Sequence, residues 1–287
     1  SAPPIFTMKA PSNTHLKKQL SSSAAYQLWW MIVVLLSGSM ATRAQEKLPA
    51  PVVLPNPPSL IEGGQSGSIT LTHVSSKPNK IIDKEDWWKN NGLKKPVVYE
   101  RFLTMARGKI PASAPKTYRE LPLVAVWSTS TRRFFSYGKQ IYKARYLLVE
   151  GANGEIEFAF DAKAYGTVAW ADVADGILYF TNNPGNISAA SGGGARIFAV
   201  DLKSNLLKWA SPKKVCKGQF AVVAGSVVCG YGFTGEPDAI TVWDRFSGDL
   251  IQTIKLKTAA NWIIQKKAKL YIRCYNTDEV FRIEIRD

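Results

Sequence analysis

The stretch Ala199–Ala210, "AVDLKSNLLKWA", has the pattern of a strand, a tight turn and a second strand that ends in Trp209. An apolar run leads into Asp201, and a polar turn separates it from the apolar residues that follow. Asp accepts hydrogen bonds from the amides of a turn that it opens, and Asn205 is suited to the positive φ that such a turn requires. The stretch therefore predicts a β-hairpin, and its recurrence along the chain decides the fold.

Related segments occur at a nearly constant spacing: "EFAFDAKAYG" from Glu157, "IFAVDLKSNLLKW" from Ile197, "ITVWDRFSGDLIQTI" from Ile240 and "VFRIEIRD" from Val280. They align on four acidic residues that are 40, 43 and 40 residues apart, namely Asp161, Asp201, Asp244 and Glu284. Each unit also contains a continuous apolar run, as buried inner strands do: "ARYLLVEGA", "DGILYFTNN", "GSVVCGYGF" and "AKLYIRCYN". Four short strands in a unit of about 40–45 residues predict an all-β protein built from β-propeller blades.

The repeat resembles that of the PQQ-like (quinoprotein-type) β-propellers, whose blades carry an apolar–Asp–x–x–Thr/Ser–Gly–x–x–x–Trp hairpin. The resemblance covers about residues 138–287, and Trp209 matches the tryptophan that packs between blades in that family. The family's catalytic aspartate, calcium ligands and vicinal cysteines have no counterpart in this sequence. The resemblance therefore implies a non-catalytic member, and we expect no cofactor, no metal and no catalytic residue.

The sequence divides into three regions. Residues 1–44 form a signal peptide or a membrane anchor, residues 45–68 a linker rich in Pro, Gly and Ser, and residues 69–287 the propeller domain. Four units are recognisable, and strand candidates between residues 64 and 137 (among them "GSITLTHV" and "LPLVAVWSTSTRRFFSY") leave open a fifth or sixth blade. The alternative is an incomplete ring that closes through oligomerisation.

The N-terminal region has the features of an export signal. Residues 24–41 carry no charge and are mostly apolar, lysines precede them, and small residues suitable for cleavage after Ala41 or Ala44 follow. The same stretch has the minimum length of a membrane-spanning anchor. Either alternative places the rest of the chain in the periplasm or outside the cell.

Charge restricts the partners of the protein. Thirty-seven Lys and Arg residues against 22 Asp and Glu give a net charge of +15, spread along the chain. This favours a protein partner or an anionic component of the cell envelope. Nucleic acid is the least favoured partner, because no nucleic-acid-binding motif accompanies the charge.

Residue types limit the chemistry as well. The chain has two histidines, of which only His73 follows the export signal, and it has no metal-protease, EF-hand or P-loop motif. The three cysteines, Cys216, Cys229 and Cys274, include no CxxC pair, which excludes a zinc ribbon. They form either one disulfide and one thiol, or three buried thiols.

Recognition is the remaining role, and three groups of residues are candidates for it. They are an aromatic pair (Trp87 and Trp88), a basic pair (Arg132 and Arg133) and a polar loop (Asn182, Asn183 and Asn186). Structural roles are the alternative for the first two pairs: the tryptophans would cap the core, and the arginines would lie on a half-exposed strand.

The sequence thus predicts a secreted or periplasmic propeller that binds a protein or an envelope component as a scaffold, without catalysis. The alternatives are a quinoprotein-type oxidoreductase or a fragment of one, and a glycan-binding module.

Overall fold

The computed structural model describes residues 48–53, 67–79, 84–93, 98–100, 114–129, 132–139, 144–163, 165–183, 194–232 and 236–286. The chain divides into two compact units, Ser1–Leu48 and Pro49–Asp287, and every described element lies in the second. The predicted signal or anchor at residues 24–41 falls outside the described residues. Within the described ranges, no helix combines the length and apolar character that crossing a membrane requires.

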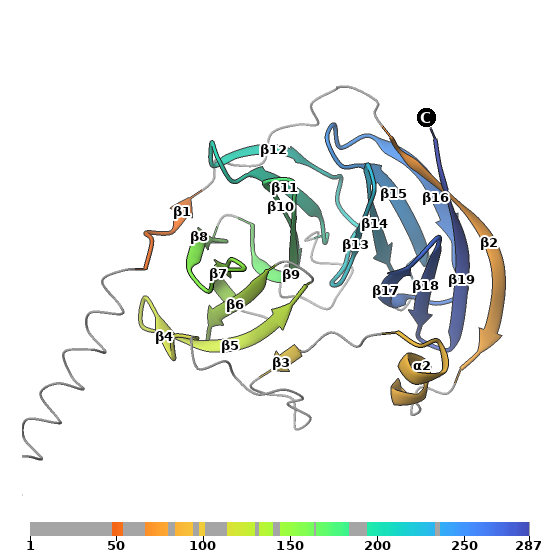
Figure 1. Cartoon of the computed structure of the whole chain (residues 1–287), viewed down its shortest axis with the longest axis horizontal. Helices are drawn as coiled ribbons and strands as arrows, with labels where there is room; N and C mark the ends of the chain where they lie inside the picture. The colour runs from red at the N-terminus through yellow and green to blue at the C-terminus, as the bar shows by residue number, and fades with distance from the viewer. Residues whose placement is uncertain are drawn as a thin grey trace, which may run out of the picture. The chain divides into compact units, whose positions relative to one another are not determined.

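Two of the four sheets are formed by the repeats that decided the prediction. Each is an antiparallel meander in which consecutive strands are neighbours (Figure 1). The second sheet consists of β9 (Thr167–Ala174), β10 (Ile177–Asn183), β11 (Ile197–Asp201) and β12 (Leu206–Ala210). The third consists of β13 (Ala221–Val223), β14 (Ser226–Tyr231), β15 (Ala239–Asp244) and β16 (Leu250–Lys255). The hairpin of the opening stretch is formed by β11 and β12, as predicted.

The fourth sheet joins the two ends of the second unit. Its strands β17 (Ala260–Lys266), β18 (Lys269–Cys274) and β19 (Thr277–Ile285) are completed by β2 (Ile69–Pro78), which runs antiparallel to β19. The "GSITLTHV" segment therefore does not begin an additional blade but supplies the fourth strand of the last one. Glu284 also differs from the prediction, because it lies inside β19 and opens no turn.

In the first sheet the predicted alignment of the repeat is wrong by one strand. Its meander runs through β5 (Leu121–Ser128), β6 (Arg133–Gly138), β7 (Ala144–Glu150) and β8 (Ile156–Asp161). Asp161 ends the fourth strand, whereas Asp201 ends the third strand of its sheet, so Glu150 is the equivalent acidic residue. Three short strands extend this sheet: β1 (Val52–Val53) beside β8, and β3 (Val98–Glu100) and β4 (Thr117–Tyr118) beside β5.

The architecture is that of an all-β propeller with four-stranded blades. The described part of the chain contains four such sheets, which succeed one another in chain order from β5–β8 to β17–β19 with β2 (Figure 1). Propellers are built from about four to eight blades of this kind. The last sheet is completed by β2, a strand that precedes the first sheet in the chain.

Buried strands hold neighbouring sheets together on both faces. All six residues of β14 are buried, as its continuous apolar run predicted. Val227 and Cys229 belong to a core shared with the first and second sheets, whereas Val228 belongs to a core shared with β2 and the fourth sheet. Because side chains alternate along a strand, one strand contributes to two cores.

Two glutamine side chains, here called the glutamine clips, add polar connections between sheets. Gln219 accepts a hydrogen bond from the Ile263 amide (2.6 Å) and donates one to the Ile263 carbonyl (2.9 Å) in β17. Gln252 in β16 pairs in the same manner with Leu71 in β2, at 2.9 and 3.1 Å. Each clip satisfies a backbone donor and acceptor that would otherwise lie unpaired between two sheets.

Candidate functional site

The turn aspartates have the structural role that the repeat predicted. Asp201 Oδ1 accepts hydrogen bonds from the amides of Lys203 (2.8 Å) and Ser204 (2.9 Å). Asp244 Oδ1 accepts equivalent bonds from Phe246 (2.9 Å) and Ser247 (2.8 Å). The residues that close these turns have positive φ, 57° at Asn205 and 81° at Gly248.

Trp209 packs between the second and third sheets, as the resemblance implied. Its side chain is 1% exposed, and its Nε1 donates a hydrogen bond to the Arg245 carbonyl at 2.9 Å. A Cβ placed on Gly248 would lie 2.7 Å from the indole ring, so the ring rests on the glycine backbone. Tyr179 Oη donates to the same carbonyl at 3.1 Å. These contacts fix the β15–β16 turn of the third sheet to strands β10 and β12 of the second sheet.

The predicted basic pair is engaged in ion pairs. Arg132 Nε lies 2.8 Å from Glu157 Oε2, and Arg133 Nη1 lies 2.6 Å from the buried Glu150 carboxylate. Both arginines lie at the start of β6, and their charges are largely compensated within the first sheet. Binding of an anion by this pair stays a prediction.

The predicted polar loop is described only at its base. Asn182 is 7% exposed, donates a hydrogen bond to the Tyr165 carbonyl and accepts one from the Arg196 amide at 2.8 Å. Its amide therefore fixes the end of β10, and partner binding by the loop stays a prediction. Asn183 ends β10, and Asn186 lies outside the described residues.

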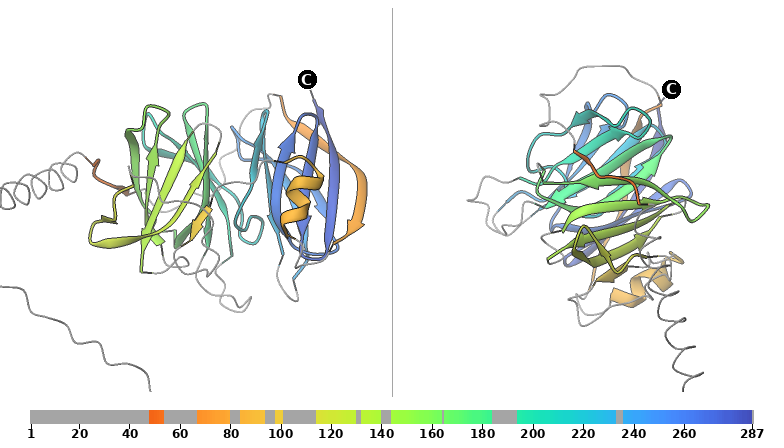
Figure 2. Two further views of the ribbon diagram at one scale, coloured as in Figure 1. Left: turned by 60° about the horizontal axis from the view of Figure 1, so that its bottom comes forward. Right: turned by 90° about the vertical axis from the view of Figure 1, so that its left-hand side faces the viewer.

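The predicted aromatic pair lies on α2 (Lys84–Asn90), and both residues are buried, Trp87 at 3% exposure and Trp88 at 5%. They end an aromatic series, here called the tryptophan row: Trp127, Trp170, Trp262, Trp88 and Trp87. Successive ring centroids are 5.3, 6.0, 5.4 and 4.7 Å apart. The first three indoles come from β5, β9 and β17, the first strands of their meanders. The row thus fixes α2 beside the fourth sheet, where Figures 1 and 2 place it.

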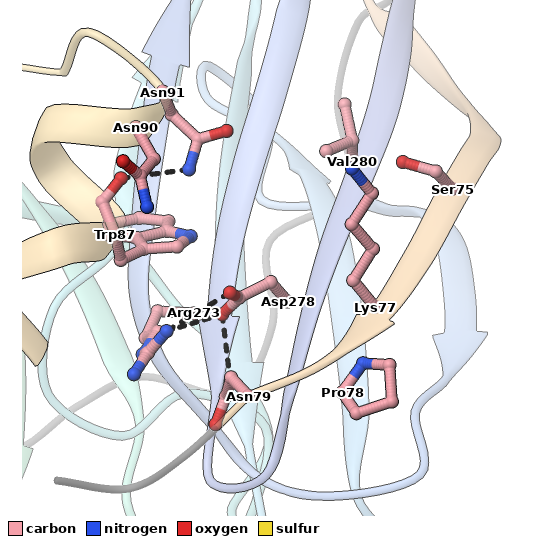
Figure 3. Close-up of a pocket in the computed structure, with 10 residues that line it drawn as sticks. All are labelled: Ser75, Lys77, Pro78, Asn79, Trp87, Asn90, Asn91, Arg273, Asp278 and Val280. Atoms are coloured by element: carbon pink, nitrogen blue, oxygen red, sulfur yellow. Dashed lines mark hydrogen bonds and ion pairs between the residues drawn. The ribbon is translucent and has the colours of Figure 1, made fainter. Parts of the chain in front are cut away.

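A cavity of about 390 Å³ opens beside Trp87, between α2, β2 and the β18–β19 hairpin (Figure 3). It is lined by Ser75, Lys77, Pro78, Asn79, Trp87, Asn90, Asn91, Arg273, Asp278 and Val280. This cavity, here called the Trp87 pocket, is polar apart from the indole, Pro78 and Val280. Of the residues predicted to bind a partner, only Trp87 lines it.

A carboxylate-centred network forms the floor of the Trp87 pocket. Arg273 Nη1 donates to both oxygens of Asp278, at 2.9 and 3.0 Å, and Asn79 Nδ2 donates to Asp278 Oδ1 at 2.8 Å. Asn91 Nδ2 donates to the Trp87 carbonyl at 2.8 Å, which fixes the end of α2. No local sequence pattern marks the pocket, because its walls come from β2 and β19, which are far apart in the chain.

A second group of titratable residues lies at the β14–β15 end of the third sheet. Lys214 pairs with Glu236 at 2.7 Å, and Tyr231 donates a hydrogen bond to the same carboxylate. Burial lowers the pKa of Lys217, an effect that the charges of Asp238 and Glu236 oppose. In the part of the chain that the structure describes, no group of three or more His, Cys, Asp or Glu residues is arranged to hold a metal ion.

The cysteines form one disulfide and one thiol. Cys216 is bonded to Cys229 in β14, and Cys274 is free and buried. Burial raises the pKa of the Cys274 thiol to about 12, so this sulfur remains protonated at neutral pH. Of the two cysteine states that the sequence left open, the structure has the first.

No protein-family model matches the chain, and no curated protein matches it. It is similar to solved structures that include the computationally designed protein Ika4 (13% identity, 54% of this chain and 87% of that chain, TM-score 0.37). A europium-containing methanol dehydrogenase matches at 15% identity over 45% of this chain and 24% of that chain, with a TM-score of 0.33. BamB from Moraxella catarrhalis matches at 13% identity over 74% of this chain and 100% of that chain, with a TM-score of 0.26. All three likenesses are distant, and the β-propeller class rests on the strand order and sheet packing described above.

Proposed function

We propose that this propeller is a non-catalytic, PQQ-like module of the periplasm or the extracellular space that binds a protein of the cell envelope and acts as a scaffold. The main support for this proposal is a set of exposed apolar side chains at two turns, the β11–β12 turn of the second sheet and the β15–β16 turn of the third. Leu206 is 60% exposed, Phe246 40% and Leu250 52%. Phe246 and Leu250 lie in and directly after the β15–β16 turn that Trp209 contacts, and Leu206 begins the strand that carries Trp209, so all three are attached to a packed base. Exposed apolar side chains on a rigid base are suited to anchoring a protein partner.

The Cys216–Cys229 disulfide supports a location outside the cytoplasm, because disulfides persist in oxidising compartments. The net charge of +15 favours attraction of the protein to anionic components of the cell envelope. Membrane association through residues 24–41 and assembly into a homo-oligomer or larger complex are parts of the same proposal.

The use of the repeat carboxylates supports a non-catalytic role. Asp201 and Asp244 hold their turns through backbone amides, and Asp161 accepts hydrogen bonds from Arg145 and from the Lys163 amide. Each of these carboxylates stabilises the fold. A direct test of catalysis adds PQQ and calcium and measures dye-linked oxidation of alcohols and sugars; cofactor-dependent turnover would overturn this part of the proposal.

Partner binding is tested with a triple variant, Leu206→Ser, Phe246→Ser and Leu250→Ser. Immobilised wild-type protein is crosslinked to a solubilised envelope fraction, and the products are identified by mass spectrometry. We expect one protein to be enriched on the wild type and lost from the triple variant. The matched control, Val74→Ser with Ile285→Ser, removes exposed apolar side chains from the fourth sheet and should retain the partner.

Equal retention by the triple variant and the wild type, with unchanged melting temperatures, would contradict the proposed surface. Location is tested separately by cell fractionation and by counting thiols in the denatured, unreduced protein. We expect one thiol per chain in the periplasmic or secreted fraction. Three thiols in a cytoplasmic fraction would contradict the proposed location.

A further inference from the structure

Three cations lie side by side on one face of the fourth sheet. Lys266 in β17 is directly opposite Lys269 in β18, and Lys269 is directly opposite Arg282 in β19. The three strands are consecutive neighbours (Figure 1), and all three residues are exposed. Neighbouring strands are about 5 Å apart, so this group, here called the cationic row, extends over about 10 Å.

Strand alternation sets the direction in which the cationic row points. Leu270 and Phe281 are buried in the core that the fourth sheet shares with the third. Successive side chains of a strand point to opposite faces, so the adjacent Lys269 and Arg282 point away from that core. Lys266 is paired with Lys269 and therefore shares its face. The row thus lies on the face of the fourth sheet that the third sheet does not cover.

The protein compensates only part of the charge of the cationic row. Arg282 Nε pairs with Glu284 at 3.0 Å, and the arginine side chain remains 59% exposed. Lys266 Nζ donates a hydrogen bond to the Asn91 carbonyl at 2.7 Å, which is an uncharged partner. Neither lysine of the row forms an ion pair with a residue that the structure describes. Like charges directly opposite each other destabilise a sheet, so an anion from outside would stabilise the row.

Two further cations extend this charge at the same end of the fourth sheet. Lys267 lies in the β17–β18 turn beside the cationic row, and Arg286 directly follows β19; both are exposed. Together with the row they place five cations next to one carboxylate, that of Glu284. Ile285, between this carboxylate and Arg286, is 66% exposed and adds an apolar side chain.

The chemistry of the cationic row favours an extended anionic surface over a single small anion. A lysine is a flexible point charge, and it lacks the planar fork with which an arginine selects one carboxylate or phosphate. Because the row lies on an exposed sheet face, a small anion bound there would remain in water. A membrane surface presents many phosphates at once and compensates all the cations together.

We propose that the cationic row docks the propeller on a membrane surface that carries anionic phospholipid headgroups. The ammonium groups of Lys266 and Lys269 and the guanidinium group of Arg282 contact the headgroup phosphates. This proposal rests on the proposed placement of the protein at the cell envelope and adds a lipid contact to the scaffold role. It uses neither the exposed apolar turns of the second and third sheets nor residues 24–41.

Sedimentation of the full chain with lipid vesicles tests the proposal. Vesicles of phosphatidylcholine alone are compared with vesicles of equal parts phosphatidylcholine and phosphatidylglycerol, so insertion of the apolar residues 24–41 would contribute equally to both. Each Lys or Arg near an anionic surface strengthens binding about fivefold, so we expect the wild type to prefer the anionic vesicles by about 100-fold or more. Salt at about 1 M, where the screening length is about 3 Å, should abolish this preference. Equal binding to both kinds of vesicle would overturn the proposal and would leave the test of the protein partner unaffected, because the vesicles contain no protein.

Two variants with the same net charge locate the lipid contact. The row variant replaces the three cations of the row: Lys266→Gln, Lys269→Gln and Arg282→Gln. The matched control replaces three exposed lysines beside the first and third sheets: Lys116→Gln, Lys255→Gln and Lys257→Gln. The row variant should lose about 100-fold of the preference for anionic vesicles, and the control less than about fivefold. Equal losses would mean that net charge alone sets the preference and would overturn the assignment of the row.

Lys269→Glu keeps the test decisive if the row variant fails to fold. A glutamate between Lys266 and Arg282 replaces two repulsive cross-strand pairs with two attractive ones, so the melting temperature should stay the same or rise. The change of two charges should weaken the preference for anionic vesicles about 25-fold. Wild-type preference in this variant would place the lipid contact elsewhere and overturn the proposal.

An acidic protein is the other macromolecule that five cations could bind, and soluble polyglutamate is the probe for it. We expect polyglutamate to bind more weakly than the anionic vesicles do, because it offers no fixed surface of phosphates. Tighter binding of polyglutamate than of the vesicles, lost in the row variant, would assign the cationic row to an acidic protein and overturn the lipid partner.

Discussion

At the scale of single residues, the fold depends on a few positions where backbone conformation and packing coincide. Gly248 is the clearest case: it has a φ of 81° and also leaves the space that the Trp209 ring occupies. A glycine in an Asp–x–x–Ser–Gly turn is suited to positive φ. The resemblance implied that Trp209 packs between blades, but its contact with Gly248 is seen only in the structure.

Gly248→Ala should therefore lower the free energy of unfolding by more than the same substitution at a turn glycine that has free space around it. The positive φ alone costs an alanine about 1–2 kcal/mol, and the methyl group 2.7 Å from Trp209 adds about 1–3 kcal/mol. The matched control is Gly154→Ala, at a φ of 79° with no atom within 4 Å of the new methyl group. Urea denaturation measures both, and equal losses would mean that Trp209 does not pack against Gly248 in solution.

Asp161 makes the stability of the first sheet depend on pH. Burial opposes its ionisation, but hydrogen bonds from Arg145 and the Lys163 amide outweigh burial and hold the pKa below its usual value. A lowered folded-state pKa stabilises the protein above the unfolded-state value of about 3.9, and this contribution is lost as the pH falls through the folded-state pKa.

The free energy of unfolding lost by Asp161→Asn should thus be largest at neutral pH and shrink below about pH 4. Urea titrations of the wild type and the variant from pH 3 to pH 7 measure this difference. Arg145→Gln removes the main favourable partner of Asp161 and should flatten the dependence. A difference that stays constant over the whole range would rule out a lowered pKa.

At the scale of elements, connections between sheets matter as much as strand pairing within them. The glutamine clips illustrate this, because each joins one side-chain amide to both backbone groups of a residue in the next sheet. Neither glutamine stands out in the sequence. A clip is defined only by the position of the facing strand, and that position depends on the packing of two whole sheets.

Gln252→Ala should lower the free energy of unfolding by about 1–3 kcal/mol, because the Leu71 amide and carbonyl lose their partners. Gln265→Ala is the matched control, since the Gln265 side chain is exposed and its amide donates one hydrogen bond, to the Lys267 carbonyl. It should change stability by no more than about 0.5 kcal/mol. Equal effects of the two substitutions would show that the clip does not stabilise the β16–β2 junction.

The first sheet shows that similar sequence patterns do not always form the same strand of a blade. "EFAFD" and "IFAVD" have the same apolar–acidic pattern, yet they form the fourth strand of one sheet and the third strand of another. Consecutive strands of a meander face similar surroundings and carry similar residues. Spacing alone therefore could not distinguish Asp161 from the true equivalent, Glu150.

At the scale of the whole molecule, the fold class followed from the sequence and the candidate pocket did not. The hairpins that revealed the repeat are local, and Asp, Ser, Gly and Asn define their turns within six residues of chain. The Trp87 pocket is assembled from β2, α2 and the β18–β19 hairpin. Of its lining, only Trp87 stands out in the sequence, because paired tryptophans are conspicuous, whereas no pattern marks out Asn79, which follows β2, or Asp278, which lies in β19.

The disulfide stabilises the molecule by restricting its unfolded state. Cys216 and Cys229 are 13 residues apart, and closing a loop of this size contributes about 3 kcal/mol. Reduction should lower the melting temperature of the wild type in differential scanning calorimetry. It should leave the paired variant Cys216→Ser with Cys229→Ser unchanged, and equal responses of the two proteins would contradict the bond.

The pairing of β2 with β19 also sets the order of events during synthesis. Thr72 hydrogen-bonds to Glu284, 212 residues further along the chain, so β2 enters the compartment in which the protein folds long before its partner. The first three sheets contain no strand from this distant region and can form as they emerge. The fourth sheet can be completed only when β19 is available to pair with β2. A stalled or truncated chain therefore keeps β2 as an exposed, unpaired edge, which distinguishes it from the finished protein for chaperones and proteases.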